Sequence, residues 1–175
     1  AGGMVRGGVE VLWLLGADDV ALDRIPPETF VIYQGHHGDR AAARADIILP
    51  GAAYTEKPGT YVNTAGRVQR AYRAVFAPGE AREDWRIIRA FSEVVGHTLP
   101  YDTLEQLRAH MARVSPVFAL SSPPAGLLAG KGAALAPASV AEAGSFTDGP
   151  FRPVIRDYYQ TNAISRASQT MAECS

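Results

Sequence analysis

The chain has 175 residues, of which 47% are hydrophobic and 20% charged, and its formal net charge is −1. This length and composition suit a globular protein with its own core, and the charge balance excludes a strongly basic face for nucleic acid. The longest apolar run, Val11 to Leu15, is too short to span a bilayer. The single cysteine, Cys174, excludes a disulfide framework within the chain and any all-cysteine iron–sulfur or zinc site.

The first residue is Ala1 rather than Met, and residues 1–8 hold no signal-peptide hydrophobic segment. We therefore expect a processed N-terminus, a chain that continues further upstream, or a fragment boundary.

Three short apolar runs predict the strands of a parallel sheet. They are residues 9–15, 29–34 and 45–49, and a short helix capped by Asp39 and reaching Arg44 separates the last two. The alternation of strands and connections is typical of an α/β unit. Because the runs are apolar on both faces, we expect a sheet that is covered on both sides.

A long polar segment, residues 51–69, follows the third run and has neither a helical nor a strand period. Pro58 restricts φ, whereas Gly59 and Gly66 permit positive φ, so the segment predicts an ordered and functional loop. Three side chains could cross-link it by charge-assisted hydrogen bonds, namely Glu56, Asn63 and Arg67. A surface loop with ordinary turn chemistry would explain the same residues.

The second half of the chain contains two predicted helices, a linker and a tail. Apolar residues at helical spacing predict helices over 83–95 and 103–114. We assign residues 1–114 to an α/β domain segment and residues 115–150, rich in Ala, Gly, Pro and Ser, to an extended linker. Residues 151–175 are apolar enough for a docking tail with a helix near its end, which could dock on its own domain or on a partner.

Two candidate ligand sites lie around the second strand. His36, His37 and Asp39 could form a metal cluster, but adjacent histidines diverge on regular backbone and no third imidazole or thiolate is near, so local turn hydrogen bonds are the simpler explanation. Gly35 and Gly38 could cradle a phosphate at a helix start, without a full dinucleotide or P-loop pattern.

No convincing catalytic set is present in the sequence. Ser165 and Ser168 have no base nearby in the sequence, and Cys174 lies at the chain end. Glu56 and Arg67 are better explained as a structural ion pair than as an acid–base couple. We therefore expect no catalytic residue and no metal site in this chain.

Several long motifs nevertheless resemble one family in the same order along the chain. They are VIYQGHHG at 31–38, the whole of 45–69, AREDWRIIRA at 81–90, LPYDTL at 99–104 and ISRASQTMAEC at 164–174. Together they resemble the C-terminal region of the large iron–sulfur (75 kDa) subunit of respiratory complex I, NADH:ubiquinone oxidoreductase.

That family is similar to a wider group, the molybdopterin-dependent oxidoreductases. In the wider group a segment EKxGTxxNxEGRxQ lies near the pterin cofactor. The matching positions are Glu56, Lys57, Gly59, Thr60, Asn63, Gly66, Arg67 and Gln69. Ala65 stands where the pattern commonly has Glu, which agrees with a relic loop kept for folding rather than for a cofactor.

The resemblance implies a partial doubly wound parallel sheet with flanking helices, completed by another chain. The iron–sulfur clusters of the family are held by an N-terminal part that this sequence lacks, so no cofactor is expected here. The implied role is structural: the chain would assemble the peripheral arm of a proton-translocating enzyme, with the N-terminal iron–sulfur part and other arm subunits as partners. Neither nucleic-acid binding nor direct membrane insertion is implied.

The implied location is the matrix side of the mitochondrial inner membrane, or the cytoplasmic face of a bacterial inner membrane. Two alternatives remain for the function. One is the cofactor-binding domain of a molybdopterin enzyme such as a formate dehydrogenase. The other is a free-standing α/β binding protein with a pocket near residues 35–39.

Overall fold

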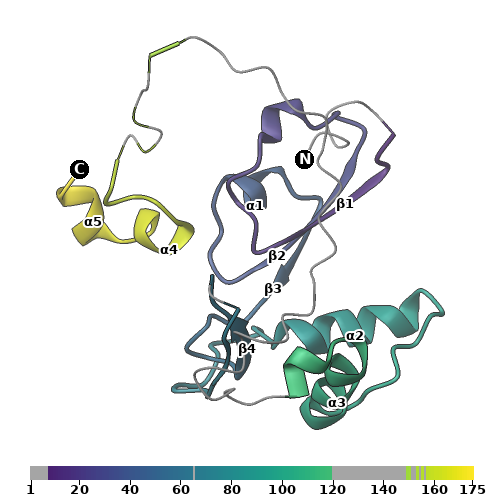
Figure 1. Ribbon diagram of the computed structural model, residues 1–175. Coiled ribbons are helices and arrows are strands. Elements are labelled where there is room, and N and C mark those ends of the chain that lie inside the picture. Colours follow the sequence, from purple (N-terminus) through teal and green to yellow (C-terminus); the bar gives the residue numbers. More distant parts are fainter. Residues whose placement is uncertain (1–7, 65, 120–148, 151–152, 154, 156) are drawn as a thin grey trace. The chain divides into compact units, whose positions relative to one another are not determined.

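Three parallel strands form the sheet that positions every later feature. The computed structural model describes residues 8–64, 66–119, 149–150, 153, 155 and 157–175. Strands β1 (Val11–Leu15), β2 (Phe30–Gly35) and β3 (Ile47–Pro50) lie in the order β1-β2-β3, and β2 pairs with both neighbours in parallel (Figure 1). The predicted parallel α/β unit is confirmed, with each apolar run forming a strand within two residues of its expected bounds.

Short connections cover one side of this sheet and supply its small core. A 3-10 turn, η1 (Leu22–Arg24), lies between β1 and β2, and the five-residue helix α1 (Arg40–Arg44) lies between β2 and β3. The fully buried cluster consists of Leu14, Val31, Tyr33 and Ala41. Burial of these apolar groups is the main favourable term that holds the unit together.

Strand β3 is an exposed edge of the sheet among the described residues, and coverage of the sheet on both sides stays a prediction. Ile47 and Ile48 are 43% and 55% exposed. Successive residues of a strand point to opposite faces, so both faces of β3 are open among the described residues. Within the part of the chain that the structure describes, β3 pairs only with β2.

The polar segment after β3 contains a β-hairpin rather than only a loop. Strands β4 (Gly59–Val62) and β5 (Val68–Ala71) pair antiparallel, with Val62 opposite Val68 at the turn. The expectation of no strand period was therefore wrong here. Thr60, Tyr61 and Val62 are residues that favour strands, and a short turn with a glycine follows them, which is a hairpin signal.

Helix α2 (Asp84–Val94) confirms the predicted helix over 83–95. Its approach is fixed by a parallel bridge between Gly51, just after β3, and Arg82. The ring of Phe91 on α2 packs edge-on against Trp13 of β1, with 4.7 Å between the ring centroids. Aromatic pairs of this geometry add to the ordinary gain from burial.

Helix α3 (Leu104–Val114) confirms the second predicted helix. Thr103 and Gln106 form a reciprocal capping box at its start, which satisfies two backbone N–H groups. A 3-10 turn, η2 (Pro116–Ala119), follows. The rest of the predicted linker up to residue 148 lies outside the described residues.

The chain divides into two compact units, which are described separately. The first unit comprises residues 1–58, 72–100 and 155–175, and the second comprises 59–71 and 101–154. The sheet and α2 therefore belong to the first unit, and the hairpin and α3 to the second.

The tail holds two short helices instead of the single helix expected near its end. These are α4 (Ala163–Arg166) and α5 (Gln169–Glu173), both in the first unit. The break has a local cause, because the Ser168 side chain accepts a hydrogen bond from the N–H of Met171 and so starts a new helix.

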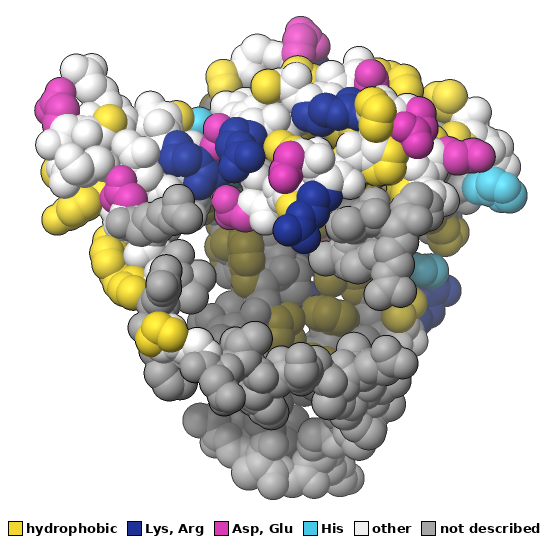
Figure 2. All heavy atoms as spheres, turned by 90° about the horizontal axis from the view of Figure 1, so that it is seen from above, with side chains coloured by type: hydrophobic (Ala, Val, Ile, Leu, Met, Phe, Trp, Pro, Cys, Tyr) yellow, Lys and Arg dark blue, Asp and Glu magenta, His cyan; other side chains and the backbone are white. Residues whose placement is uncertain are grey.

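One face of the described part of the chain is mixed in charge (Figure 2). Figure 2 shows acidic and basic side chains intermingled on the face it presents, with hydrophobic side chains between them. Among the described helices, none has both the length and the apolar character needed to cross a membrane.

Candidate functional site

The carboxyl ends of β1 and β2 carry a cluster of acidic side chains. Asp18 and Asp19 follow β1 after a turn at Gly16, where φ is +59° and the N–H donates to the carbonyl oxygen of Gln34 at 2.7 Å. Asp39 precedes α1. This edge of a parallel sheet is where open α/β folds bind their ligands.

Buried hydrogen bonds fix Asp18 within this cluster. The hydroxyl group of Tyr33 lies 3.1 Å from Asp18 Oδ2 and 2.7 Å from the carbonyl oxygen of His37, so its one proton is shared between two acceptors. Asp18 Oδ1 accepts a hydrogen bond from the N–H of Ala41 at 3.4 Å. The Asp18 carboxylate thus lies against the first turn of α1, as the helix dipole favours.

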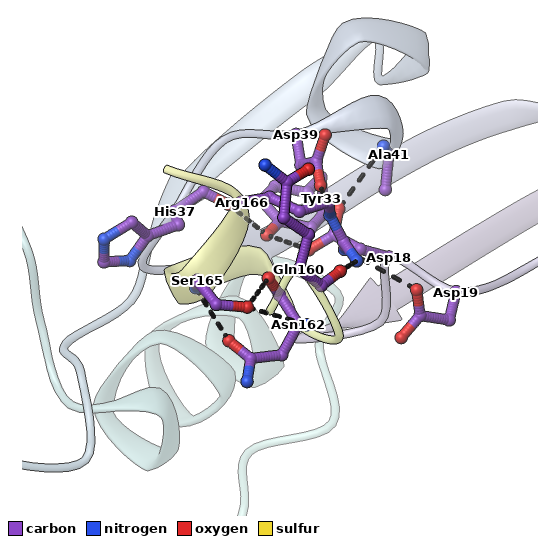
Figure 3. A network of polar contacts seen from close by, with 10 residues as sticks. All are labelled: Asp18, Asp19, Tyr33, His37, Asp39, Ala41, Gln160, Asn162, Ser165 and Arg166. Carbon is purple, nitrogen blue, oxygen red and sulfur yellow. Dashed lines mark hydrogen bonds and ion pairs between the residues drawn. The ribbon is translucent and has the colours of Figure 1, made fainter. Parts of the chain in front are cut away.

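Arg166, from the tail, supplies the cation that balances the cluster. Its Nε donates to Asp39 Oδ2, and its Nη2 lies 3.5 Å from Asp19 Oδ1 (Figure 3). Asp39 was expected to cap α1 with its side chain. It holds the N-cap position, but its side chain makes no capping bond and pairs with Arg166 instead.

The electrostatic consequences follow these contacts. The hydrogen bond from Arg166 holds the pKa of Asp39 below its usual value. Burial, followed by the charge of Asp18, raises the pKa of Tyr33 to about 12. At neutral pH Asp39 is therefore an ionised carboxylate beside the guanidinium group of Arg166. Tyr33 is a neutral phenol that can donate a hydrogen bond.

A small cavity lies beside these groups. Its volume is about 170 Å³, and it is lined by the loop after β1, by His36 and by the first turn of α4. A phosphate-bearing cofactor does not suit this edge, because two carboxylates and a paired arginine surround the cavity and Asp18 already occupies an N–H of α1. The edge favours a cationic occupant.

Among the described residues, no further metal-ligating side chain joins His36 and His37 to form a metal cluster. The Nδ1 atoms of His36 and His37 lie 2.6 Å apart, so they share one proton. Burial lowers the pKa of His36, and the neighbouring His37 and Lys57 lower it further. No group of three or more potential metal-ligating side chains is found among the described residues.

The charged residues at the start of the pterin-like pattern turn inward to support the backbone. Glu56 Oε2 accepts a hydrogen bond from the N–H of Ala53 at 2.9 Å. The Lys57 ammonium pairs with Asp84 Oδ2 at the start of α2. Asp84 Oδ1 also accepts a 2.9 Å hydrogen bond from the side chain of Gln34, which is fully buried at the end of β2.

Gly51 leaves the space that this arrangement needs. A Cβ atom added at Gly51 would lie 2.9 Å from Asp84 Oδ1. The close approach allows one carboxylate to join the pterin-like loop, the sheet and α2. No local signal in the sequence marks Asp84 as a link, because its partners lie 27 and 50 residues away.

The remaining pattern positions form the hairpin of the second unit. Gly59 and Thr60 lie in β4, and Gln69 lies in β5. The turn is closed by Asn63, whose side-chain oxygen accepts a 2.9 Å hydrogen bond from the N–H of Arg67, and Gly66 adopts φ of +77°. The Glu56–Arg67 ion pair stays a prediction.

The tail serines have structural partners. The Ser165 side chain and Asn162 cap α4 reciprocally, and Ser168 caps α5. Cys174 is exposed at the chain end. Arg166 was missed by sequence analysis, because its partner Asp39 lies 127 residues away and no local pattern marks the pair.

Comparison with known proteins gives two family matches. Residues 2–94 match the family model described as molybdopterin oxidoreductase. Residues 122–174 match a second family model, which describes the C-terminal region of an NADH-ubiquinone oxidoreductase subunit.

Individual relatives agree with these matches. The chain is 52% identical over 169 residues to the mitochondrial NADH-ubiquinone oxidoreductase 78 kDa subunit of Neurospora crassa, covering 94% of this chain and 22% of the relative. It is 45% identical to the 75 kDa subunit of Reclinomonas americana, covering 94% and 23%. It is 47% identical to the mitochondrial NADH dehydrogenase [ubiquinone] iron-sulfur protein 1 of Solanum tuberosum, covering 94% and 22%.

The chain thus spans less than a quarter of the length of these relatives. The first match covers more than half of its residues. The chain belongs to the molybdopterin oxidoreductase family, and within it resembles the C-terminal region of the large NADH-ubiquinone oxidoreductase subunits.

Proposed function

We propose that this chain is a structural, non-redox segment of the 75 kDa subunit of complex I. In that role it supports electron transfer from NADH to ubiquinone by helping to assemble the peripheral arm, and it holds no cofactor of its own. The iron–sulfur clusters belong to the N-terminal part of the same subunit. The location that goes with this role is the matrix side of the mitochondrial inner membrane, or the cytoplasmic face in a bacterium.

The observation that carries the structural role is the use of Lys57. In a cofactor site, a lysine of the loop would be available to a phosphate or another anion. Here its ammonium group pairs with Asp84, and Asp84 is held in turn by the buried Gln34. The positive charge of Lys57 therefore helps to attach α2 to the sheet through Asp84.

The exposed apolar edge supports the proposed partner. Ile47 and Ile48 open both faces of β3 to solvent among the described residues. Burying apolar surface contributes about 25 cal/mol per Å², so an open edge of this kind favours a covering layer. We assign that layer to the N-terminal iron–sulfur part of the subunit, with other arm subunits and the tail completing the contacts.

The first experiment locates the chain. Solubilised membranes are separated on a native gel, and mass spectrometry maps this chain across the lanes. Co-migration with NADH dehydrogenase activity and with the cysteine-rich N-terminal part is the expected result. Migration as a small species on its own would overturn the proposal.

A second experiment tests the covered edge. Ile48→Glu places a carboxylate on the exposed strand and should lower the amount of chain in the high-mass band. Ala109→Glu, at an exposed position of α3, is the matched control and should leave that amount unchanged. Equal incorporation of Ile48→Glu and wild type would argue against β3 as the covered edge.

The alternative function is the cofactor-binding domain of a molybdopterin-dependent oxidoreductase such as a formate dehydrogenase. It is favoured by the family match over residues 2–94. It requires molybdenum that co-purifies with the chain in a stoichiometric amount. Metal analysis of the same native-gel band separates this alternative from the structural role.

A further inference from the structure

The acidic edge of the sheet and the tail that lies against it form one arrangement. Asp18, Asp19 and Asp39 come from two loops of the sheet. Arg166 reaches Asp19 and Asp39 from more than 120 residues further along the chain. All belong to the first compact unit. Figure 3 shows the contacts that converge on the guanidinium group of Arg166.

The edge lacks the features that hold a phosphate. Phosphate binding at this place in an α/β fold relies on free N–H groups and on positive charge. The N–H of Ala41 already donates to Asp18, and Tyr33 donates to Asp18 or to the carbonyl oxygen of His37. Carboxylates held in this way attract a planar cation, and an arginine fits two of them at once.

The tail presents Arg166 through local structure that is weak by itself. Helix α4 has only four residues, and isolated helices this short are unstable in water. Its start is held by the capping box of Asn162 and Ser165, and Arg166 Nη1 lies 3.5 Å from the carbonyl oxygen of Gln160. The order of the segment therefore depends on where Arg166 binds.

We propose that residues 160–174 form an intramolecular latch, in which Arg166 occupies the carboxyl edge of the chain's own sheet in place of a phosphate-bearing ligand. The tail docks in cis on the loops after β1 and β2. In this arrangement the carboxylates at the edge of the sheet bind the guanidinium group of Arg166. It does not depend on the proposed role in complex I, because every contact lies within this chain.

Hydrogen–deuterium exchange, measured by mass spectrometry on the protein in its native assembly, tests the latch. Two variants break it from opposite sides: Arg166→Gln removes the cation, and Asp39→Asn removes the carboxylate but keeps a good N-cap residue for α1. Each should make the amides of residues 163–174 exchange about tenfold faster, the size expected for a charge-assisted hydrogen bond. The double variant should exchange no faster than Arg166→Gln alone, because Arg166→Gln already removes the contact with Asp39.

Arg113→Gln is the matched control. Arg113 lies on α3, in the other unit, and its partner is His110 at 2.8 Å. It should leave exchange at 163–174 unchanged. If Arg166→Gln and Asp39→Asn behave like this control, the latch is refuted. If only Arg166→Gln accelerates exchange, Asp39 is not the residue that holds Arg166, and the latch as proposed, with Asp39 as the main partner of Arg166, is refuted.

The choice of ligand is tested with inorganic pyrophosphate at millimolar concentration. We expect no added protection of residues 16–19 and 35–41 in the wild type or in Arg166→Gln. Protection of these loops by pyrophosphate would show a phosphate site and would overturn the assignment of the edge to guanidinium.

Discussion

Replacing Lys57 with methionine tests whether the pterin-like loop supports the fold. The variant keeps a side chain of similar length but removes the charge that pairs with Asp84. Asp84 would retain the 2.9 Å hydrogen bond from Gln34 and lose the ammonium group that balances its charge. The expected result is a weaker attachment of α2 to the sheet.

The size of the effect follows from burial. The side chains of Lys57 and Asp84 are 21% and 27% exposed, so the pair lies between a fully buried and a surface ion pair. Breaking a buried pair costs about 3–5 kcal/mol and an exposed pair about 0.2–1 kcal/mol, so we expect a cost of about 2 kcal/mol for this pair. That loss corresponds to roughly 30-fold faster exchange of the α2 amides when they open locally.

The assay is hydrogen–deuterium exchange of residues 88–94 in the native assembly. Glu80→Gln is the control, because the Glu80–Arg82 pair is 88% and 53% exposed and should matter little. In an Asp84→Asn background, Lys57→Met should cost much less, since the carboxylate that needs the lysine is gone. A Lys57→Met effect no larger than that of Glu80→Gln would refute a structural use of this lysine.

Three further predictions concern backbone space and pH. Gly51→Ala should destabilise the protein by about 1–3 kcal/mol in urea unfolding followed by tryptophan fluorescence, because the new Cβ would meet Asp84 Oδ1 at 2.9 Å; an unchanged midpoint would contradict this contact. Gly66→Ala should cost about 1 kcal/mol, read as faster exchange of the β4 and β5 amides, because φ is +77° there; Gly66→Asn should cost less, and equal costs would argue against a strained turn. The Tyr33 pKa is raised from 10.0 to about 12, so the folded state keeps a proton that the unfolded state loses, and stability should fall as pH rises from 10 to 12. In Tyr33→Phe this fall should be shallower in unfolding midpoints, and an identical pH profile would contradict the shift.

The sheet and the helices could be predicted because their signals are local. Apolar runs marked β1, β2 and β3, and helical spacing marked α2 and α3. The hairpin was missed because charged and polar residues dominate the segment, although Thr60 to Val62 favour a strand and the glycine turn follows. Attention to these three residues would have found β4.

The contacts that define the candidate site could not be predicted in the same way. Asp39 had a sufficient local explanation as a helix cap, yet its carboxylate binds Arg166. Asp84 suited the first turn of a helix, yet its carboxylate also pairs with Lys57 and accepts a hydrogen bond from Gln34. A helix start tolerates an acidic residue whatever its partner, so its local preference hides the long-range contact.

Three acidic residues, Asp18, Asp39 and Asp84, show how the fold itself uses groups that a ligand could otherwise bind. Ligand sites of α/β sheets need charges and N–H groups that the fold itself leaves free. Asp84 pairs with the lysine of the loop. Asp18 accepts a hydrogen bond from an N–H of α1, and Asp39 pairs with the arginine of the tail. Each bond that strengthens the segment removes a group that a phosphate-bearing ligand would use. Variants that free these groups should therefore lose stability before they gain affinity for an anion, and exchange and pyrophosphate protection measured on the same samples would reveal that order.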